Sequence, residues 1–210
     1  MNSVNLDGKP ISPSKVICIG RNYVDHIHEL GNEMPDEMVV FLKPNSAISN
    51  ELSSFHQEPL HYEGEICLMV ISGEFRAVGF GLDLTKRQLQ GKLKSKGLPW
   101  ERAKAFDGSA VMGDFVTIDN SDNIDNIDDS LSLKLTINGE VIQQGGVELM
   151  MYKPQQILES LKEHFTLEDG DIVMTGTPKG VGVIEAGAQF HGIILSAQQT
   201  LLESRWLAQS

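Results

Sequence analysis

The stretch HYEGEICLMVI, residues 61–71, says most about how this chain folds. It begins with alternating polar and apolar residues and continues as an unbroken apolar run, which is the pattern of a strand with one polar end and one buried end. Glu63 and Glu65 are two residues apart, so a strand directs both side chains to the same face. The stretch therefore predicts a core strand with two carboxylates at its polar end.

Other short apolar runs predict further strands, and the polar sequence between two of them predicts a loop over residues 45–59. The predicted strands are KVICIG (15–20), MVVFLKP (38–44) and AVGFGLDL (77–84).

Three segments have the pattern and the end signals of helices. They are residues 21–31, which end at Gly31, residues 85–97, with Thr85 as the cap and Gly97 as the stop, and residues 153–165, which open at Pro154.

The sequence LSLKLTINGEVIQQG, residues 131–145, predicts a β-hairpin, because Asn138-Gly139 lies between two alternating runs and suits a type I′ turn. Residues 171–182 predict a strand that runs into a glycine-rich turn. Many short strands with few helices predict the α+β class, and the length of 210 residues fits a single domain over 1–210.

Composition excludes several classes of function. A net charge of −12 repels a phosphate backbone and an anionic membrane surface alike, so neither nucleic acid nor membrane is expected as a partner. The N-terminus lacks the pattern of an export signal, and apolar residues nowhere run long enough to span a bilayer. Cys18 and Cys67 each lie within an apolar run, which predicts reduced core residues in a cytoplasmic protein.

Two further segments resemble ligand-binding loops only superficially. Residues 119–130, DNSDNIDNIDDS, have Ile124 where a calcium-binding EF-hand loop needs glycine and Ser130 where it needs glutamate, so a solvated acidic loop is expected. The sequence GTPKGVG at 176–182 lacks the Gly-Lys-Ser/Thr ending of a phosphate-binding loop.

The carboxylates Glu63, Glu65 and Asp83 are the candidate metal ligands. Two carboxylates held together repel unless a cation or a shared proton relieves them, and Asp83 at the end of another predicted strand could supply a third oxygen. An all-carboxylate set favours Mg²⁺ or Mn²⁺, with Ca²⁺ also possible, over zinc. The alternative is that the two glutamates line a wet sheet face.

Five further residues could carry chemistry, and each has a structural alternative. His26 and Glu29, three apart on a predicted helix, could form a general base for water or an incidental surface pair. Lys104 lies among apolar residues and could be catalytic or a surface lysine with a buried stem. Arg87 and Gln90 share a helix face that could bind substrate or face solvent.

Six sequence blocks occur in an order that resembles the fumarylacetoacetate hydrolase family, in particular its short acylpyruvate hydrolase and oxaloacetate decarboxylase branch. The resemblance covers about Lys15 to Gly192. The blocks are GRNYVDH (20–26), FLKP (41–44), HYEGE (61–65), LDLT (82–85), GLPWERAKAFD (97–107) and GDIVMTGTPKGVG (170–182).

The resemblance implies a mixed β-sandwich or roll with a few short flanking helices, in a protein that forms homodimers. It also implies a role for each candidate residue: Mg²⁺ or Mn²⁺ on Glu63, Glu65 and Asp83, contact with the metal-bound substrate by Lys104, action on the attacking water by His26 and Glu29, and binding of the substrate carboxylate by Arg87, Gln90 and Thr177.

The implied substrate is a small 2-oxo acid, and the implied reaction is hydrolysis of the C–C bond of an acylpyruvate to pyruvate and a carboxylate. Decarboxylation of oxaloacetate and keto–enol isomerisation of a 2-oxo acid are alternatives that use the same site. A further alternative is a binding protein that kept the fold and lost turnover.

One departure from the family concerns the segment between Glu65 and Asp83. Relatives carry a longer connection there that includes a helix, and this chain lacks it. The shortening leaves the candidate ligands in place, and the features that it can alter are their exact geometry and the wall of the pocket.

Overall fold

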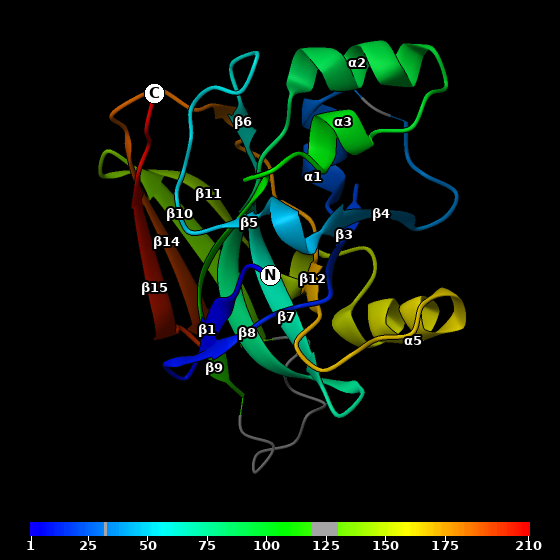
Figure 1. The fold of residues 1–210 in the computed structure, drawn as a ribbon, viewed down its shortest axis with the longest axis vertical. Coiled ribbons are helices and arrows are strands. Elements are labelled where there is room, and N and C mark those ends of the chain that lie inside the picture. Colours follow the sequence, from blue (N-terminus) through cyan, green and yellow to red (C-terminus); the bar gives the residue numbers. More distant parts are fainter. Residues whose placement is uncertain (32, 119–129) are drawn as a thin grey trace.

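The computed structural model describes residues 1–31, 33–118 and 130–210, and its largest unit is a mixed nine-stranded sheet. Along the sheet the strands follow the order β2-β1-β9-β8-β7-β12-β3-β4, and β5 pairs with β9 off this path (Figure 1). The bounds are β1 Val4–Leu6, β2 Lys9–Ile11, β3 Lys15–Gly20, β4 Val39–Pro44, β5 Ile48–Ser49, β7 Gly64–Ile71, β8 Glu74–Asp83, β9 Ala110–Thr117 and β12 Ile172–Met174.

The predicted core strand lies in the middle of this sheet. It is divided at Glu63 into β6 (His61–Tyr62) and β7, and β7 is hydrogen-bonded between β8 and β12. All of β7 except its last residue is buried, which is what the continuous apolar run predicts. β6 pairs separately with the short strand β13 (Gly182–Val183).

A second sheet of four strands, in the order β11-β10-β14-β15, packs against the first. Its strands are β10 (Leu131–Ile137), β11 (Glu140–Gly146), β14 (Gln189–Ser196) and β15 (Gln199–Leu207). The shared core includes Phe80 of the large sheet and Trp206 of the smaller one, whose ring centroids lie 6.0 Å apart. Two packed sheets with a few short helices confirm the predicted α+β sandwich (Figure 1).

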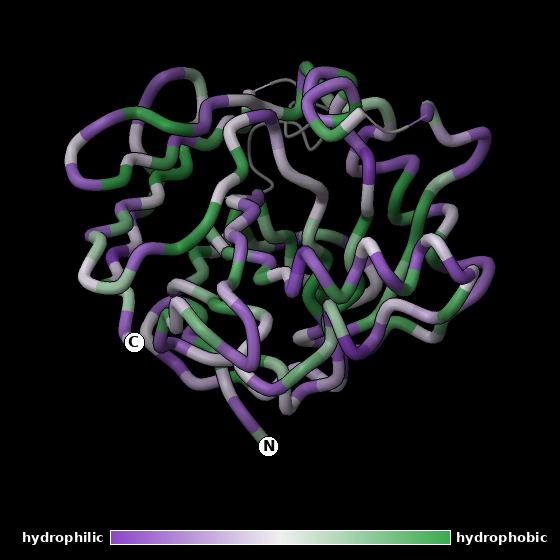
Figure 2. Tube along the Cα trace, turned by 90° about the horizontal axis from the view of Figure 1, so that it is seen from above, coloured by the Kyte–Doolittle hydropathy of each residue, from purple (hydrophilic) through white to green (hydrophobic). Residues whose placement is uncertain are grey.

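The helices lie outside the sheets. α1 (Val24–Glu29), α2 (Arg87–Ser95) and α3 (Glu101–Lys104) gather near the ends of β3 and β4, and α5 (Pro154–His164) lies on another side (Figure 1). α5 buries Ile157, Leu158 and Leu161 on one face, as its amphipathic sequence predicts. Hydrophobic segments follow the inner strands, and hydrophilic ones are mainly on the outer loops and helices (Figure 2).

Most of the predicted end signals are confirmed. Gly31 and Gly97 follow their helices with φ of +59° and +60°, the left-handed conformation that glycine adopts without steric cost. Asn138 and Gly139 both have positive φ, as a type I′ hairpin between β10 and β11 requires. Both cysteines are buried and free.

The cap predicted at Thr85 is wrong. α2 begins two residues later, with Lys86 at the cap position, because the Thr85 hydroxyl is bound instead to Nζ of Lys104 and to Glu63. The predicted loop at 45–59 is partly wrong as well, since β5 lies within it. The acidic loop predicted at 119–130 lies, apart from Ser130, outside the described residues. No helix in the described part of the chain is long and apolar enough to cross a membrane.

Candidate metal centre and active site

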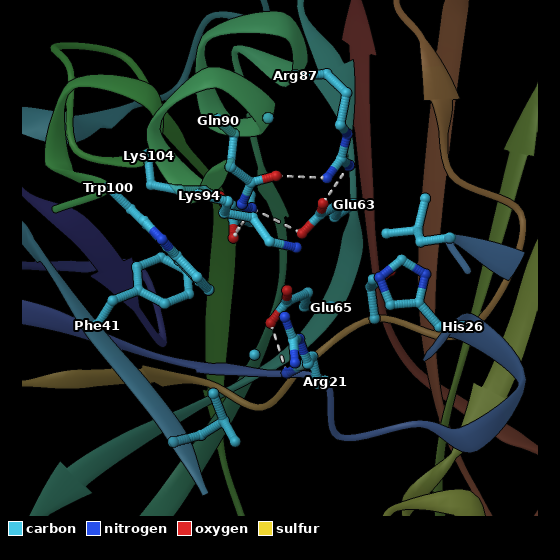
Figure 3. Close-up of a pocket in the computed structure, with 17 residues that line it drawn as sticks. Arg21, His26, Phe41, Glu63, Glu65, Arg87, Gln90, Lys94, Trp100 and Lys104 are labelled. Carbon is cyan, nitrogen blue, oxygen red and sulfur yellow. Dashed lines mark hydrogen bonds and ion pairs between the residues drawn. The ribbon is translucent and has the colours of Figure 1, made fainter. Parts of the chain in front are cut away.

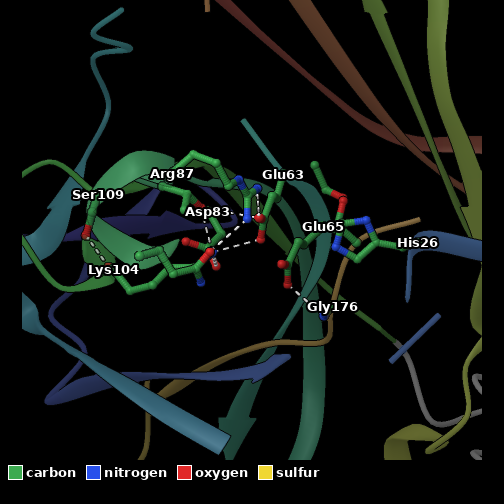
Figure 4. A network of polar contacts seen from close by, with 12 residues as sticks. His26, Glu63, Glu65, Asp83, Arg87, Lys104, Ser109 and Gly176 are labelled. Atoms are coloured by element: carbon green, nitrogen blue, oxygen red, sulfur yellow. Dashed lines mark hydrogen bonds and ion pairs between the residues drawn. The ribbon is translucent and has the colours of Figure 1, made fainter. Parts of the chain in front are cut away.

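The three predicted carboxylates converge, because β7 and β8 are antiparallel neighbours. The Asp83 amide donates to the Glu63 carbonyl at 2.9 Å, so these two residues lie opposite each other, and Glu65 follows on the same face. One oxygen from each carboxylate lies within 4.8 Å of the others, and all three residues are buried (Figure 4). The alternative in which the two glutamates line a solvent-exposed sheet face does not hold, because both are buried.

Basic side chains surround two of these carboxylates. Lys104 Nζ donates to Glu63 Oε2 and Asp83 Oδ2, each at 2.8 Å, and Arg87 pairs with the other oxygen of Glu63. Lys43 Nζ lies 2.8 Å from Asp83 Oδ1, but not in the direction of a hydrogen bond, so that buried oxygen accepts none within the described residues. Lys104 is 3% exposed, which excludes the surface-lysine alternative.

Glu65 differs from its neighbours. Its carboxylate accepts a hydrogen bond from the Gly176 amide at 2.7 Å and forms no ion pair within the described ranges. Burial, followed by the charges of Asp83 and Glu63, raises the pKa of Glu65 well above its usual range. For Glu63, burial acts in the same direction, but Lys104 and Arg87 outweigh it and hold the pKa well below the usual range.

This donor set fits a hard divalent cation. Three carboxylates supply the oxygen ligands that Mg²⁺, Mn²⁺ and Ca²⁺ prefer. Asp83 Oδ1 has unused acceptor capacity, and the Glu65 carboxylate is held by one amide against like charges. A bound cation would relieve the repulsion that raises the pKa of Glu65.

The predicted His26–Glu29 pair lies beside the carboxylates. Nδ1 of His26 is 3.2 Å from Glu29 Oε2, and Glu29 Oε1 accepts the Gly180 amide at 2.9 Å, which ties α1 to the glycine-rich turn. Because an ionised carboxylate only accepts, Nδ1 is the donor in this contact, and Nε2 is the nitrogen left for a ligand. His26 is buried, and it faces Glu65 in Figure 3.

The other predicted site residues, Arg87, Gln90 and Thr177, also line the pocket around the carboxylates. Arg87 donates to the Gln90 amide oxygen at 2.9 Å, and both line the pocket, so the solvent-facing alternative does not hold. The Thr177 hydroxyl donates to the Gly64 carbonyl at 2.9 Å and accepts from Gln143 at 2.8 Å. Its hydroxyl is therefore committed within the protein, which leaves its backbone for a ligand.

Sequence reasoning missed Lys43 and Gln143. Lys43 is fully buried on β4, and its ammonium donates to the backbone carbonyls of Lys104 and Ser109 as well as pairing with Asp83. A lysine inside the apolar run MVVFLKP is the signal that could have identified it, because a buried ammonium needs partners. Gln143 had no comparable signal in the sequence.

A cavity of about 250 Å³ is lined by most of the predicted site residues, namely Glu63, Glu65, Asp83, His26, Arg87, Gln90, Lys104 and Thr177. The carboxylates and Lys104 form its inner end, His26 lies on one side, and Phe41 and Trp100, with ring centroids 6.1 Å apart, lie on the other (Figure 3). None of its lining residues falls between 66 and 82. The shortened connection is a tight turn between β7 and β8, and none of its residues lines the pocket.

Comparison with known proteins places the chain in a family. The model of the fumarylacetoacetate (FAA) hydrolase C-terminal domain matches residues 15–205. Oxaloacetate tautomerase YcgM of Escherichia coli K12 is 35% identical over 194 residues, which cover 83% of this chain and 85% of that protein. Human mitochondrial oxaloacetate tautomerase FAHD1 is 36% identical over 199 residues, covering 85% of this chain and 88% of that protein.

Solved structures agree with this placement. A candidate fumarylacetoacetate isomerase/hydrolase from Oleispira antarctica superposes with a TM-score of 0.92 at 32% identity, covering 99% of this chain and 100% of that one. Fumarylpyruvate hydrolase from Pseudomonas aeruginosa, solved with Mn²⁺ and pyruvate, gives 0.83 at 27% identity, covering 100% of this chain and 96% of that one. The chain belongs to the fumarylacetoacetate hydrolase family.

Proposed function

We propose that this protein is a divalent-metal-dependent enzyme that acts on small 2-oxo acids through an enolate, and that its reaction is keto–enol tautomerisation of oxaloacetate. The observation that carries the proposal is the buried cluster of Glu63, Glu65 and Asp83 beside the His26–Glu29 pair. The relatives named as oxaloacetate tautomerases, between 32% and 37% identical, support the choice of substrate.

Mg²⁺ or Mn²⁺ held by Glu63, Glu65 and Asp83 would withdraw electron density from a 2-oxo group and lower the cost of an enolate. Side chains around the cation site bind the rest of the substrate. Arg87 and Gln90 hold the carboxylate next to the keto group, Arg87 as a charge-assisted donor. Lys104, whose charged form is favoured by Asp83 and Glu63 despite its burial, stabilises negative charge on the keto oxygen.

Tautomerisation also needs a proton to leave or reach C3 of the substrate. His26 exchanges that proton through Nε2, because Nδ1 is engaged with Glu29. Glu29 fixes the tautomer and orientation of the ring, and its second oxygen is held by the Gly180 amide. The pair is thus oriented before substrate arrives.

Hydrolysis of an acylpyruvate is the second candidate, favoured by the same His26–Glu29 pair. There the base would take a proton from water, which attacks the distal carbonyl, and the C–C bond would break to give a carboxylate and the enolate of pyruvate. The solved fumarylpyruvate hydrolase supports this reading. Decarboxylation of oxaloacetate needs no attacking water, so His26 would have little effect on it.

The test follows the absorbance of enol-oxaloacetate with and without Mg²⁺ or Mn²⁺, alongside acetylpyruvate absorbance and CO₂ release. We expect metal-dependent ketonisation that falls about 100-fold in His26→Ala. His28→Ala is the matched control, because His28 is exposed on the same helix. The tautomerase assignment fails if folded, metal-saturated protein does not accelerate ketonisation, and the wider proposal of an enolate-forming enzyme fails if it accelerates none of the three reactions.

Three expectations remain predictions. They are a single domain over residues 1–210, a homodimer and a cytoplasmic location. Sedimentation of the purified protein would test the second of these, and fractionation of cells would test the third.

A further inference from the structure

Arg21 has an unusual backbone conformation at the edge of the pocket. Its φ is +56°, the left-handed region that residues with a side chain seldom occupy. The next residue, Asn22, fixes the turn: its fully buried amide donates to the carbonyls of Tyr152 at 3.0 Å and Thr175 at 2.9 Å, and it accepts the Tyr152 amide at 2.7 Å. Glycine would avoid the strain, so the arginine side chain itself has a use here.

The Arg21 guanidinium lines the pocket without a carboxylate to neutralise it. Its hydrogen bond is a long one, 3.4 Å, to the carbonyl oxygen of Glu33. It forms no ion pair with any residue that the structure describes, whereas Arg87 and Lys104 in the same pocket are paired with carboxylates. Its positive charge is therefore available to a ligand.

Lys94 of α2 brings a second positive charge to the same cavity. Its ammonium lies 5.9 Å from the centroid of the Trp100 ring. Burial, and then the like charges of Arg21 and Arg87, lower the pKa of Lys94. Figure 3 shows Lys94 on the α2 side of Glu65 and Arg21 on the opposite side.

The cavity contains two groups of positively charged side chains. At the inner end, Lys43, Lys104 and Arg87 pair with Asp83 and Glu63, and a divalent cation held there together with Glu65 would give this end a net positive charge that suits one anionic, chelating group. Arg21 and Lys94 bring two further positive charges, one on each side of Glu65 (Figure 3). We propose that this pair is a specificity subsite for a second carboxylate, so that the substrate is a dicarboxylic 2-oxo acid and not one with a neutral acyl end.

This inference rests on the proposed function, and its test compares two substrates that differ by one charge. They are oxaloacetate and its 4-methyl ester, in which the distal carboxylate is neutral. In Arg21→Met and in Lys94→Met, we expect KM for oxaloacetate to rise about tenfold with kcat little changed, because the distal carboxylate does not react. The ester should be handled alike by wild type and by both variants.

Three controls make the outcome specific. Lys92→Met removes an exposed charge from the same helix and should change nothing. Arg21→Lys keeps the positive charge, so its KM for oxaloacetate should be much closer to the wild-type value than that of Arg21→Met. Inhibition by oxalate, which mimics only the chelating end, should be equal in wild type, Arg21→Met and Lys94→Met.

Two results would overturn the subsite. One is a wild-type enzyme that treats the ester and oxaloacetate equally. The other is that Arg21→Met and Lys94→Met weaken binding of both substrates, or of oxalate, to the same extent. Absence of turnover with either substrate in folded, metal-saturated wild type would instead refute the proposed function, so the two failures are distinguishable.

Discussion

Glu63 and Glu65 are only two residues apart, but their electrostatic environments are opposite. Glu63 is paired with Lys104 and Arg87, whereas Glu65 has an amide donor and two like charges as neighbours. The charged form is therefore stabilised in Glu63 and destabilised in Glu65. Glu63 holds the basic side chains in place, and Glu65 is the residue that most needs a cation.

The two glutamine variants should accordingly have opposite effects on the metal-free protein at pH 7. Glu65→Gln removes a charge that burial disfavours, so we expect stability to rise by about 1 kcal/mol. Glu63→Gln leaves Arg87 without its ion pair and Lys104 with Asp83 alone, and should cost about 3 kcal/mol. Thermal unfolding in chelator measures both, and the rise in Tm on adding Mn²⁺ should be lost in both variants.

The direction of the Glu65 pKa shift also determines how Glu65→Gln changes stability as a function of pH. Because the folded-state pKa is raised, ionisation of Glu65 costs stability increasingly as pH rises above the ordinary value of 4.5. The advantage of Glu65→Gln should therefore shrink as pH falls to that value. A Glu65→Gln protein that is less stable than wild type at pH 7 would contradict this account.

At the residue scale, the sequence predicts the carboxylates well, because a spacing of two on a strand fixes their common face. It does not predict Lys104 as a bridge between Glu63 and Asp83, because that contact depends on where α3 lies. It also misses Arg21, whose importance is visible only in its backbone angle and in the pocket that it lines.

At the scale of elements, one side chain from the four-stranded sheet fixes the break between β6 and β7. Gln143 of β11 accepts the Gly64 amide at 2.9 Å and donates to the Thr177 hydroxyl and the Pro178 carbonyl, each at 2.8 Å. A Cβ at Gly64 would come within 2.9 Å of the Gln143 oxygen, so a larger residue there would displace the Gln143 side chain. Gln143 therefore sets the relation between Glu63 and the turn at Thr177.

Replacing Gln143 with leucine should disturb this junction. It leaves the buried Gly64 amide without its acceptor, at a cost of about 1–3 kcal/mol, and we also expect weaker Mn²⁺ binding by calorimetry. Gln144→Leu is the matched control, since Gln144 is exposed on the same strand. Equal effects of the two substitutions on metal affinity would show that Gln143 has no positioning role.

The elements most clearly marked by sequence are those with local end signals. The sequence predicts the β10–β11 hairpin and α5, because Asn138-Gly139 and Pro154 determine the backbone conformation of the residues next to them. The sequence does not predict β1 and β9, and the pair that joins them, Leu6 and Phe115, links residues far apart in the chain. It also does not predict β15, although β15 forms a hairpin with the preceding strand β14. Sequence likewise does not predict that Thr85 contacts Lys104, because that contact depends on the tertiary position of α3.

At the scale of the whole molecule, distant segments are joined by a few buried polar contacts. Asp171, just before β12, is fully buried and accepts hydrogen bonds from Ser14, Lys15 and the Glu168 amide. It thereby fixes the start of β3 beside its parallel neighbour β12 in the large sheet. Burial would raise the pKa of Asp171, but these donors outweigh it and lower the pKa.

Asp171 should therefore stabilise the protein only where it is ionised. We expect Asp171→Asn to cost about 1–3 kcal/mol at pH 7 in urea unfolding. Because the folded-state pKa is depressed, the difference should persist above the ordinary value of 3.8 and disappear as pH falls below it. Asp36→Asn, at an exposed position, serves as the control. A difference that is independent of pH would contradict the assignment.

The tight turn between β7 and β8 has a practical consequence. Ser72 and Gly73 make this turn with φ of +53° and +77°, at the end of β7 opposite to Glu65, and no pocket-lining residue lies near them in sequence. A fluorophore attachment site or a short affinity peptide grafted between these two residues would thus report on the protein in cells while its chemistry continued undisturbed.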